Sequence, residues 1–483
     1  MSVFRCCVFP TLTIAIIILY TVFKIFNVIF PLLEEQGFFR NLPGFQRNGH
    51  WFFGHTLDIK KLGQKDLFNK FPSYYKFSNG LWNYRICCYD PTLVRNVLEN
   101  SDKAIDRIPI DKIILRGSSI GTRAMGPHLK YLRTIFHMCY GMHSKQHFIN
   151  ICREVSHTCL DNLGLAKNQY KILEINSLLS EITFGLPNKI WFGDLNQTLD
   201  QRLIALLKAE YCFDSILDIE STIEYCWNKM CKIIRACKHR QAFISQYTNI
   251  VERKKNMRNG KNSEKIDSQS ILDKLIILEL NGEISLSSGQ SASLYVSHLT
   301  FISSMKTNFV WLIKCLADNR LWQNKIQEEI KQMKLNGFFY GDKLRLEKFQ
   351  DLHKFVLETL RMYPAEMMTR SVTKSFHFDG REFPVGTLID IDLTLHHRNP
   401  LFWEFPNMFI PDRFSKENKR NLYEFVPFSA GQRVCPSKNF IMTVMKTFVI
   451  TFVERLDFDA VIPFTNDEEF DSLRPIKITT RAE

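Results

Sequence analysis

The chain has 483 residues, of which 45% are hydrophobic and forty are Phe, and its formal net charge is +13. This composition supports a large apolar core and excludes a disordered protein. The basic residues are spread along the chain, which favours a solvated surface over a nucleic-acid patch, even at the densest run, residues 253–258. Thirteen Cys residues without C-x-x-C spacing argue against zinc fingers and a disulfide scaffold, and favour reduced thiols.

The first 33 residues are predicted to form a membrane anchor. Cys6 to Phe23 carries no charge over eighteen residues. A helix of that length spans about 27 Å, close to the hydrocarbon core of a bilayer. A cleaved signal peptide is the alternative, but the segment lacks its small-x-small cleavage site. Pro43 and Gly44 then predict a stiff turn into one globular body, residues 34–483.

The globular body is predicted to be mainly α-helical, with a small β region at its two ends. Hydrophobic periodicity, Pro and Gly set the boundaries, and Asp379-Gly380 predicts a hairpin turn. In chain order the predicted elements are a strand at 81–89, a helix at 91–100, a mostly helical stretch at 147–243, helices at 288–318 and 346–362, strands at 375–378 and 387–393, an irregular Pro-rich segment at 400–427 and a helix at 439–455.

The segment from Pro427 to Phe440 carries the most informative residues. Cys435 is expected where a loop meets a helix, and backbone N–H groups and the helix dipole stabilise a thiolate there. Gly431 permits a tight turn, and Phe428 can cover one side of the sulfur. The alternative is a buried structural Cys in a Gly-containing loop.

This loop resembles the F-x-x-G-x-R-x-C-x-G sequence of the cytochrome P-450 family, with Phe428, Gly431, Arg433 and Cys435 in place and Ser437 replacing the last Gly. The resemblance implies the cytochrome P-450 fold, a triangular helical body around haem b. It also implies that Cys435 is the axial thiolate ligand, which favours O–O cleavage. Arg433 is then expected to bind a haem propionate.

Two further motifs lie where the resemblance requires them. Glu358 and Arg361, at i and i+3 of a predicted helix, resemble the E-x-x-R pair of the family and stand 77 residues before Cys435. Arg413 resembles the Arg that completes a buried triad with this pair. An isolated E-x-x-R is common by chance as a surface pair, so its position gives it its value. We assign these three residues to folding and haem-pocket support, not to chemistry.

The segments 379–387 and 396–400 resemble the membrane-bound, family-four-like branch, which includes fatty-acid hydroxylases. The resemblance implies that Arg370 and Arg133 contact haem propionates. Arg133 lies in a segment similar to the W-x-x-x-R helix of the family, but Leu129 replaces the Trp. A surface Arg is therefore the alternative at that position.

The oxygen-activating helix of the family carries an acid and an alcohol that relay protons, and here the sequence departs from it. A gapless alignment of residues 299–308 places Ser303 at the acid and Ser304 at the alcohol. A second register, with a three-residue gap, places Lys306 at the acid and Thr307 at the alcohol. Neither register supplies a carboxylate, although ordered water can still carry protons. Ser303, Ser304 and Thr307 are the candidate catalytic residues, and we expect weak or narrow activity.

The resemblance implies a monooxygenase that inserts one atom of O₂ into a lipophilic fatty acid, hormone or xenobiotic. Its electrons are expected to come from NADPH–cytochrome P-450 reductase, with cytochrome b5 as a further partner. Arg433, Lys438 and Lys446 are expected to meet the acidic face of the flavoprotein, with ordinary solvated charge as the alternative. The anchor implies the endoplasmic reticulum (microsomal) membrane, with the catalytic domain facing the cytosol and no nucleic-acid partner.

Two other functions are compatible with the altered oxygen helix. An isomerase or dehydratase acting on hydroperoxides keeps the haem without oxygen activation, and peroxide-supported turnover without reductase distinguishes it. A non-catalytic haem-binding or ligand-binding relative gives the ferrous–CO thiolate spectrum and substrate-induced spin shifts, but no product.

Overall fold

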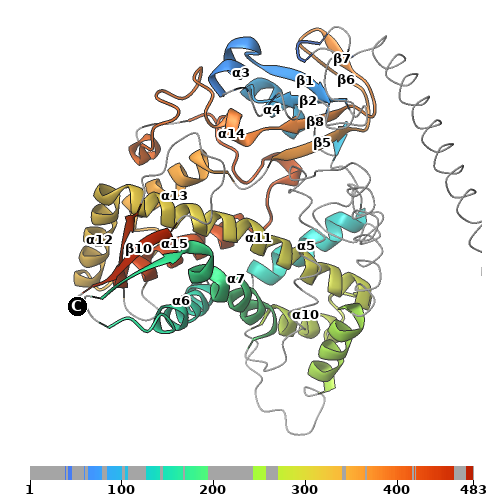
Figure 1. Cartoon of the computed structure of the whole chain (residues 1–483). Helices are drawn as coiled ribbons and strands as arrows, with labels where there is room; N and C mark the ends of the chain where they lie inside the picture. The colour runs from blue at the N-terminus through green and yellow to red at the C-terminus, as the bar shows by residue number, and fades with distance from the viewer. Residues whose placement is uncertain are drawn as a thin grey trace, which may run out of the picture. The chain divides into compact units, whose positions relative to one another are not determined.

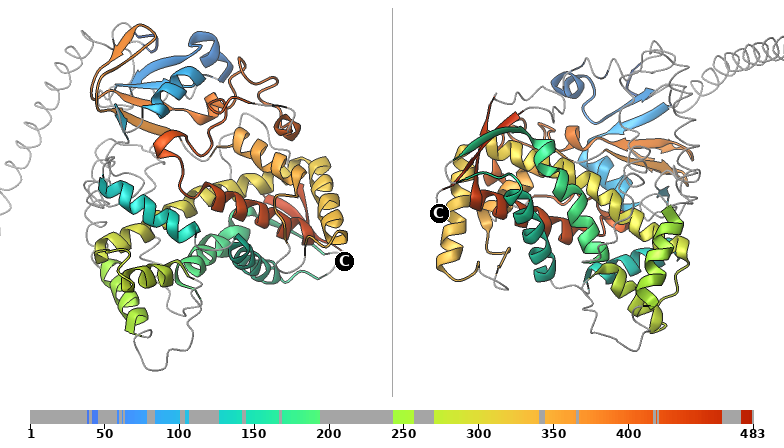
Figure 2. Two further views of the ribbon diagram at one scale, coloured as in Figure 1. Left: turned by 180° about the vertical axis from the view of Figure 1, so that it is seen from behind. Right: turned by 60° about the horizontal axis from the view of Figure 1, so that its bottom comes forward.

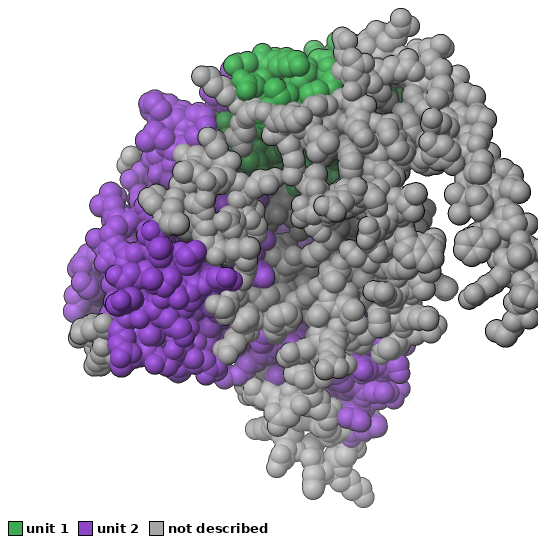
Figure 3. All heavy atoms as spheres, in the orientation of Figure 1, with its two compact units in different colours: residues 1–106, 367–399 green, residues 107–366, 400–483 purple. Residues whose placement is uncertain are grey.

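The computed structural model describes residues 39, 42–45, 59, 62, 64–78, 84–100, 104–106, 127–141, 145–166, 169–193, 243–256, 270–339, 344–364, 367–415, 418, 420–461 and 475–481. The chain divides into two compact units, residues 1–106 with 367–399 and residues 107–366 with 400–483 (Figure 3). The predicted anchor, residues 1–33, lies outside the described residues. Within those residues, none of the helices has the length and apolar character needed to cross a membrane.

The first unit contains a five-stranded sheet in the order β1-β2-β8-β5-β3 (Figure 1). β2 and β8 pair in parallel, with Ile86 opposite Ile389, and the other neighbours are antiparallel. The strands are β1 (Tyr74–Ser78), β2 (Tyr84–Cys88), β3 (Ile105–Asp106), β5 (Met368–Val372) and β8 (Leu388–Ile391), and the helices are α3 (Gln64–Lys70), α4 (Pro91–Glu99) and α14 (Leu393–His396).

Local sequence signals account for the elements of this unit. Asp90 caps α4 by accepting the N–H groups of Thr92 and Leu93, and Pro91 takes the first helical position, where no N–H is needed. The predicted helix at 91–100 is therefore confirmed. The predicted hairpin is confirmed as β6 (Phe376–Phe378) and β7 (Arg381–Phe383). Its two turn residues, Asp379 and Gly380, have positive φ angles of 52° and 68°, as in a type I′ turn.

The second unit is mainly helical (Figure 1). Its helices include α5 (Pro127–Gly141), α6 (Lys145–Asp161), α7 (Ile175–Phe192), α10 (Ile271–Leu280), α11 (Ser288–Asp318), α12 (Arg320–Leu335), α13 (Gln350–Met362) and α15 (Lys438–Arg455), with short 3-10 turns η4 (Pro411–Phe414) and η5 (Gly431–Arg433). A three-stranded antiparallel sheet, β4-β10-β9, comprises β4 (Tyr170–Glu174), β10 (Pro475–Thr480) and β9 (Leu456–Ala460).

β4 interrupts the stretch predicted to be mostly helical. It pairs with β10, so that Leu173 lies opposite Ile476. This partner lies some three hundred residues later in the sequence, which is why local periodicity gave no signal for the strand. Residues 194–242 of the same predicted stretch lie outside the described residues.

α11 is the longest described helix, with 31 residues, and has the predicted boundaries. Ser287 and Gln290 form a reciprocal capping box at its start. The helix packs against α7, α13 and α15 (Figure 2). Phe309 stacks on Phe448 of α15 with ring centres 4.0 Å apart. These contacts place α11 in the apolar core of the second unit.

A buried polar network joins α11 to two neighbouring helices. The Tyr140 hydroxyl of α5 hydrogen-bonds Nδ1 of His298 in α11. Nε2 of His298 lies 3.0 Å from the Pro187 carbonyl, which can only accept. His298 therefore carries its proton on Nε2 and accepts from Tyr140 at Nδ1. Burial lowers the pKa of His298 to about 4, so the imidazole is neutral near pH 7.

A second buried network fixes α13 to the irregular segment after residue 400. Glu358 and Arg361 are fully buried and form a two-pronged ion pair, with N–O distances of 2.7 and 2.8 Å. Arg413 approaches the same carboxylate at 3.3 Å. The Ile410 N–H donates to Glu358 at 2.7 Å. The E-x-x-R interpretation of the sequence as a buried triad thus agrees with the geometry.

We expect Glu358→Gln to lower the free energy of unfolding by about 3–5 kcal/mol, because two buried guanidinium groups lose their anion. The measurement is urea unfolding followed by tryptophan fluorescence. Asp412→Asn is the matched control, since Asp412 lies beside Arg413 but pairs with Lys354 at the surface. Its cost should be at most about 1 kcal/mol. Equal stability of the two variants would contradict a central role for the buried triad.

We expect the wild type to lose stability more steeply than His298→Gln as the pH falls. The lowered pKa means that, between pH 6.5 and about 4, the unfolded chain binds a proton that the folded chain does not. The free energy of unfolding is therefore unaffected by this proton above pH 6.5. It falls by about 3 kcal/mol as the pH decreases from 6.5 to 4. Urea midpoints across that range measure it. His377→Gln, at an exposed position, should keep the wild-type slope; a parallel slope for His298→Gln would refute the prediction.

Candidate functional site

The cysteine loop is a short, tightly closed turn before α15. The Cys435 N–H donates to the Phe428 carbonyl at 2.9 Å, and the Ser429 N–H donates to Val426 at 2.9 Å. Ser429 and Gly431 both have positive φ, 61° and 66°. Gly431 has no side chain and therefore adopts this conformation without steric cost. The tight turn predicted at Gly431 is thus confirmed. Cys435 lies three residues before the first residue of α15, as predicted for a junction between loop and helix.

Cys435 differs from every other described cysteine in its exposure. Six further free thiols in the described ranges are buried, whereas Cys435 is half-buried. Burial raises the pKa of Cys139 and of Cys152 to about 12, which keeps both protonated and unsuitable as metal ligands. Among the described cysteines, Cys435 is therefore the one that can present a sulfur to a ligand.

The donor set around this thiol fits a metal that is held mainly by an organic macrocycle. No group of three His, Cys, Asp or Glu side chains that could bind a bare metal ion occurs among the residues that the structure describes. A single protein thiolate would be sufficient for haem iron, because the porphyrin itself would supply the nitrogen donors. Cys435 is half-buried and packs against the apolar cluster that contains Phe428, which suits such a ligand.

Two of the predicted propionate-binding arginines lie at the cysteine loop. Arg133 of α5 donates to the Val434 carbonyl at 2.7 Å, next to Cys435. Arg433 is 1% exposed. The expectation that Arg433 meets a partner protein at the surface is therefore wrong. A buried guanidinium at this place is suited to an anionic group of a cofactor.

The two departures from the family sequence have different structural consequences. Ser437, in place of the last Gly, has φ −100° and ψ 11°, which a residue with a side chain adopts without left-handed strain. Leu129, in place of the Trp, is fully buried in the core of the second unit. Leu129 keeps the apolar contact but supplies no N–H donor.

Arg370 lies in β5 of the first unit, whereas Arg133 and Arg433 lie in the second. It is 1% exposed and donates to the Thr369 carbonyl at 3.0 Å. Its predicted contact with a propionate stays a prediction, as do those of Arg133 and Arg433.

The candidate catalytic residues lie on α11. The backbone of Ser303 and Ser304 is helical, and their side chains lie outside what the structure describes. Thr307 is half-buried, one turn further along. The neighbouring Asn308 is 4% exposed, and its Oδ1 accepts no hydrogen bond from the described part of the chain. Sequence reasoning missed Asn308, and it also missed His298 and Tyr140, since buried polar residues carry no periodic signal.

Comparisons with known proteins agree with this geometry. The sequence pattern of the family described as cytochrome P450 matches residues 43–479. Cytochrome P450 4B1 of Rattus norvegicus is 27% identical over 476 residues, which cover 92% of this chain and 89% of that protein. Cytochrome P450 4X1 of Homo sapiens is 25% identical over 481 residues, with coverages of 91% and 90%.

A solved structure shows the same fold. Retinoic acid-bound cyanobacterial CYP120A1 superimposes with a TM-score of 0.73 at 17% identity, covering 91% of this chain and 99% of the other. The expected cytochrome P-450 fold, mainly helical with small sheets, is thereby confirmed, whereas the expected N-terminal membrane helix stays a prediction. The relatives support the family-four-like branch. The chain belongs to the cytochrome P450 family, and it is accordingly a monooxygenase that uses haem b with a cysteine thiolate as axial ligand.

Proposed function

We propose that Cys435 is the axial ligand and that this haem-thiolate enzyme oxidises a lipophilic small molecule of the fatty-acid, hormone or xenobiotic type. The observation that supports it best is the half-buried Cys435, held by its own backbone N–H on Phe428. When bound, the haem supplies the redox chemistry that inserts one atom of O₂ into the substrate.

The residues of the chain have separate tasks in this proposal. Cys435 ligates the iron, and Phe428 excludes water from the sulfur, which strengthens the local electrostatic interactions. Arg133, Arg433 and Arg370 bind the propionates and fix the orientation of the macrocycle. Ser304, with Ser303 and Thr307 nearby in the helix, holds and passes protons at its hydroxyl oxygen.

The electron donor is proposed to be NADPH–cytochrome P-450 reductase, with cytochrome b5 as a second partner. Lys438 is exposed three residues after Cys435, which suits an acidic docking face. Residues 1–33 are proposed as the anchor in the endoplasmic reticulum membrane, with residues 34–483 as the haem domain in the cytosol. The eighteen uncharged residues from Cys6 to Phe23 support this location.

The missing carboxylate of α11 supports a second candidate function. Residues 299–308 contain no Asp or Glu, so proton delivery relies on hydroxyl groups and water. An isomerase or dehydratase of hydroperoxides needs no such delivery, because its substrate already contains the O–O bond. Product formation from a lipid hydroperoxide without NADPH or reductase distinguishes this function from monooxygenation.

We expect Cys435→Ala to abolish the ferrous–CO difference spectrum of a thiolate-ligated haem, because no other described cysteine is accessible. The readout is this spectrum together with the haem-to-protein ratio of the purified protein. Cys315→Ala, at a buried thiol, should retain the spectrum. An unchanged spectrum in Cys435→Ala would show that the ligand lies elsewhere.

We expect Ser303→Asp to raise the fraction of NADPH electrons recovered in product several-fold, because a carboxylate at that position restores an acid to the proton path. Lys306→Asp is the control for the second register and should leave the coupling unchanged. The measurement compares product formed with NADPH consumed and peroxide released. If Lys306→Asp raises this fraction and Ser303→Asp does not, the second register is correct. Residue 306 then holds the acid position and Thr307 the alcohol position.

A further inference from the structure

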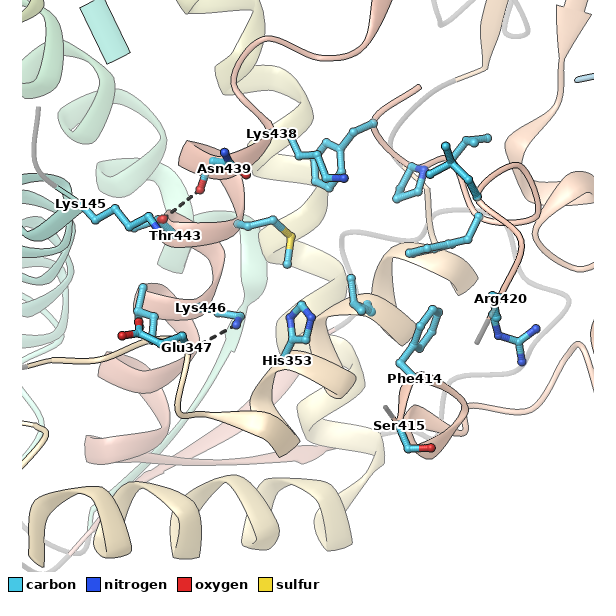
Figure 4. A pocket seen from close by; sticks show the side chains of 18 of the residues that line it. Lys145, Glu347, His353, Phe414, Ser415, Arg420, Lys438, Asn439, Thr443 and Lys446 are labelled. Atoms are coloured by element: carbon cyan, nitrogen blue, oxygen red, sulfur yellow. Dashed lines mark hydrogen bonds between the residues drawn. The ribbon is translucent and has the colours of Figure 1, made fainter. Parts of the chain in front are cut away.

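A cavity of about 1010 Å³ opens in the second unit beside the cysteine loop. One part of its wall is made by Pro427, Phe428 and Ser429 of that loop. The rest is made by the start of α6, residues 344–347, α13, described residues between Phe414 and Val426, and the first half of α15 (Figure 4). Cavities of this size accommodate a small organic molecule.

Basic side chains dominate the charged part of the lining. They are Lys145, Arg345, Arg420, Lys438 and Lys446, whereas Glu347 is the one acidic residue in the described lining. None of the five basic residues forms a salt bridge with a carboxylate of the described ranges. The described lining therefore carries more basic than acidic side chains, although Glu329 and Glu347 attract Lys446 and Glu424 attracts Arg420.

The inner polar end is formed by Lys446 and His353, whose side chains approach each other in Figure 4. The Lys446 ammonium makes one long hydrogen bond, 3.3 Å, to the Leu346 carbonyl. Two of its three donors are therefore available. The Nδ1 atom of His353 is buried and has no hydrogen-bond partner within the described residues.

Protonation at this end favours an anionic ligand. Burial lowers the pKa of Lys446 to about 8, so the group is still largely cationic at pH 7. Burial, and then the Lys446 charge, lower the pKa of His353 to about 4. His353 is therefore a neutral donor that can offer an N–H beside a cation. Glu329 and Glu347 attract the Lys446 ammonium, but Glu329 is also the acceptor of the N–H groups of Asp351 and Leu352.

Another part of the lining is apolar. Phe414, Phe425, Leu357 and Met442 are each half-buried and line the cavity. Phe428 of the cysteine loop continues this surface. Covering partly exposed aromatic and aliphatic side chains is favourable by about 25 cal/mol per Å². A ligand with an apolar body is thus suited to this end.

We propose that this cavity is a binding site for a small organic anion with an apolar body. The acid group of the ligand lies against Lys446 and His353, and its body covers the wall formed by Phe414, Phe425 and Leu357. This inference does not depend on the proposed reaction, because the test below measures binding and not turnover.

The test compares two probes with the same ring system on the purified holoprotein. The anionic probe is 8-anilinonaphthalene-1-sulfonate, and the neutral probe is N-phenyl-1-naphthylamine, which lacks the sulfonate. Lys446→Met removes the charge and keeps most of the volume. By equilibrium dialysis, we expect this variant to bind the anionic probe about tenfold more weakly, as for a lost charge-assisted hydrogen bond. Binding of the neutral probe should change less than twofold.

Lys331→Met is the matched control, since Lys331 is exposed on α12 and does not line the cavity. It should leave the affinity for both probes unchanged. Leu357→Trp, which fills the apolar part, should weaken both probes. If Lys446→Met and Lys331→Met bind the anionic probe equally well, or if Lys446→Met weakens both probes alike, the proposed anion site is wrong.

Discussion

The hydrogen bond from the Cys435 amide to the Phe428 carbonyl closes the cysteine loop, and the candidate site depends on this closure. A sulfur can bind a metal only when its direction is fixed and one side of it is open. Positive φ at Ser429 and Gly431 folds the loop back on itself. Arg133 then ties the Val434 carbonyl to α5. These contacts of the protein itself hold the backbone of the loop on both sides of Cys435.

The buried cluster around Glu358 supports the segment between residue 400 and the start of α15, where the described residues form only loops and short 3-10 turns. The carbonyl groups of such a segment need donors when they are buried. Arg361 donates to the carbonyls of Pro406 and Met408, and Arg413 donates to those of residues 404 and 405. Buried ion pairs contribute little net stability. Here their guanidinium groups replace the missing backbone hydrogen bonds, while Glu358 neutralises them.

α11 is fixed by buried hydrogen bonds at His298 but has no Asp or Glu in residues 299–308. His298 lies five residues before Ser303, and both of its ring nitrogens are already used, by Tyr140 and by the Pro187 carbonyl. Its lowered pKa also makes it a poor proton source near pH 7. It therefore does not replace the missing carboxylate. Under the proposed function, hydroxyl groups and water must carry the protons, which is the physical reason to expect inefficient coupling.

The sequence by itself determined the elements whose causes are local. The capped helix at 288–318, the hairpin at 379–380 and the tight turn at Gly431 follow from residues within a few positions of one another. Only the tertiary structure decided the pairing of β4 with β10, the burial of Arg433 and the position of Lys446 in a cavity. Strand pairing and burial depend on partners that lie far away along the chain, so no local pattern of charge or periodicity contains them.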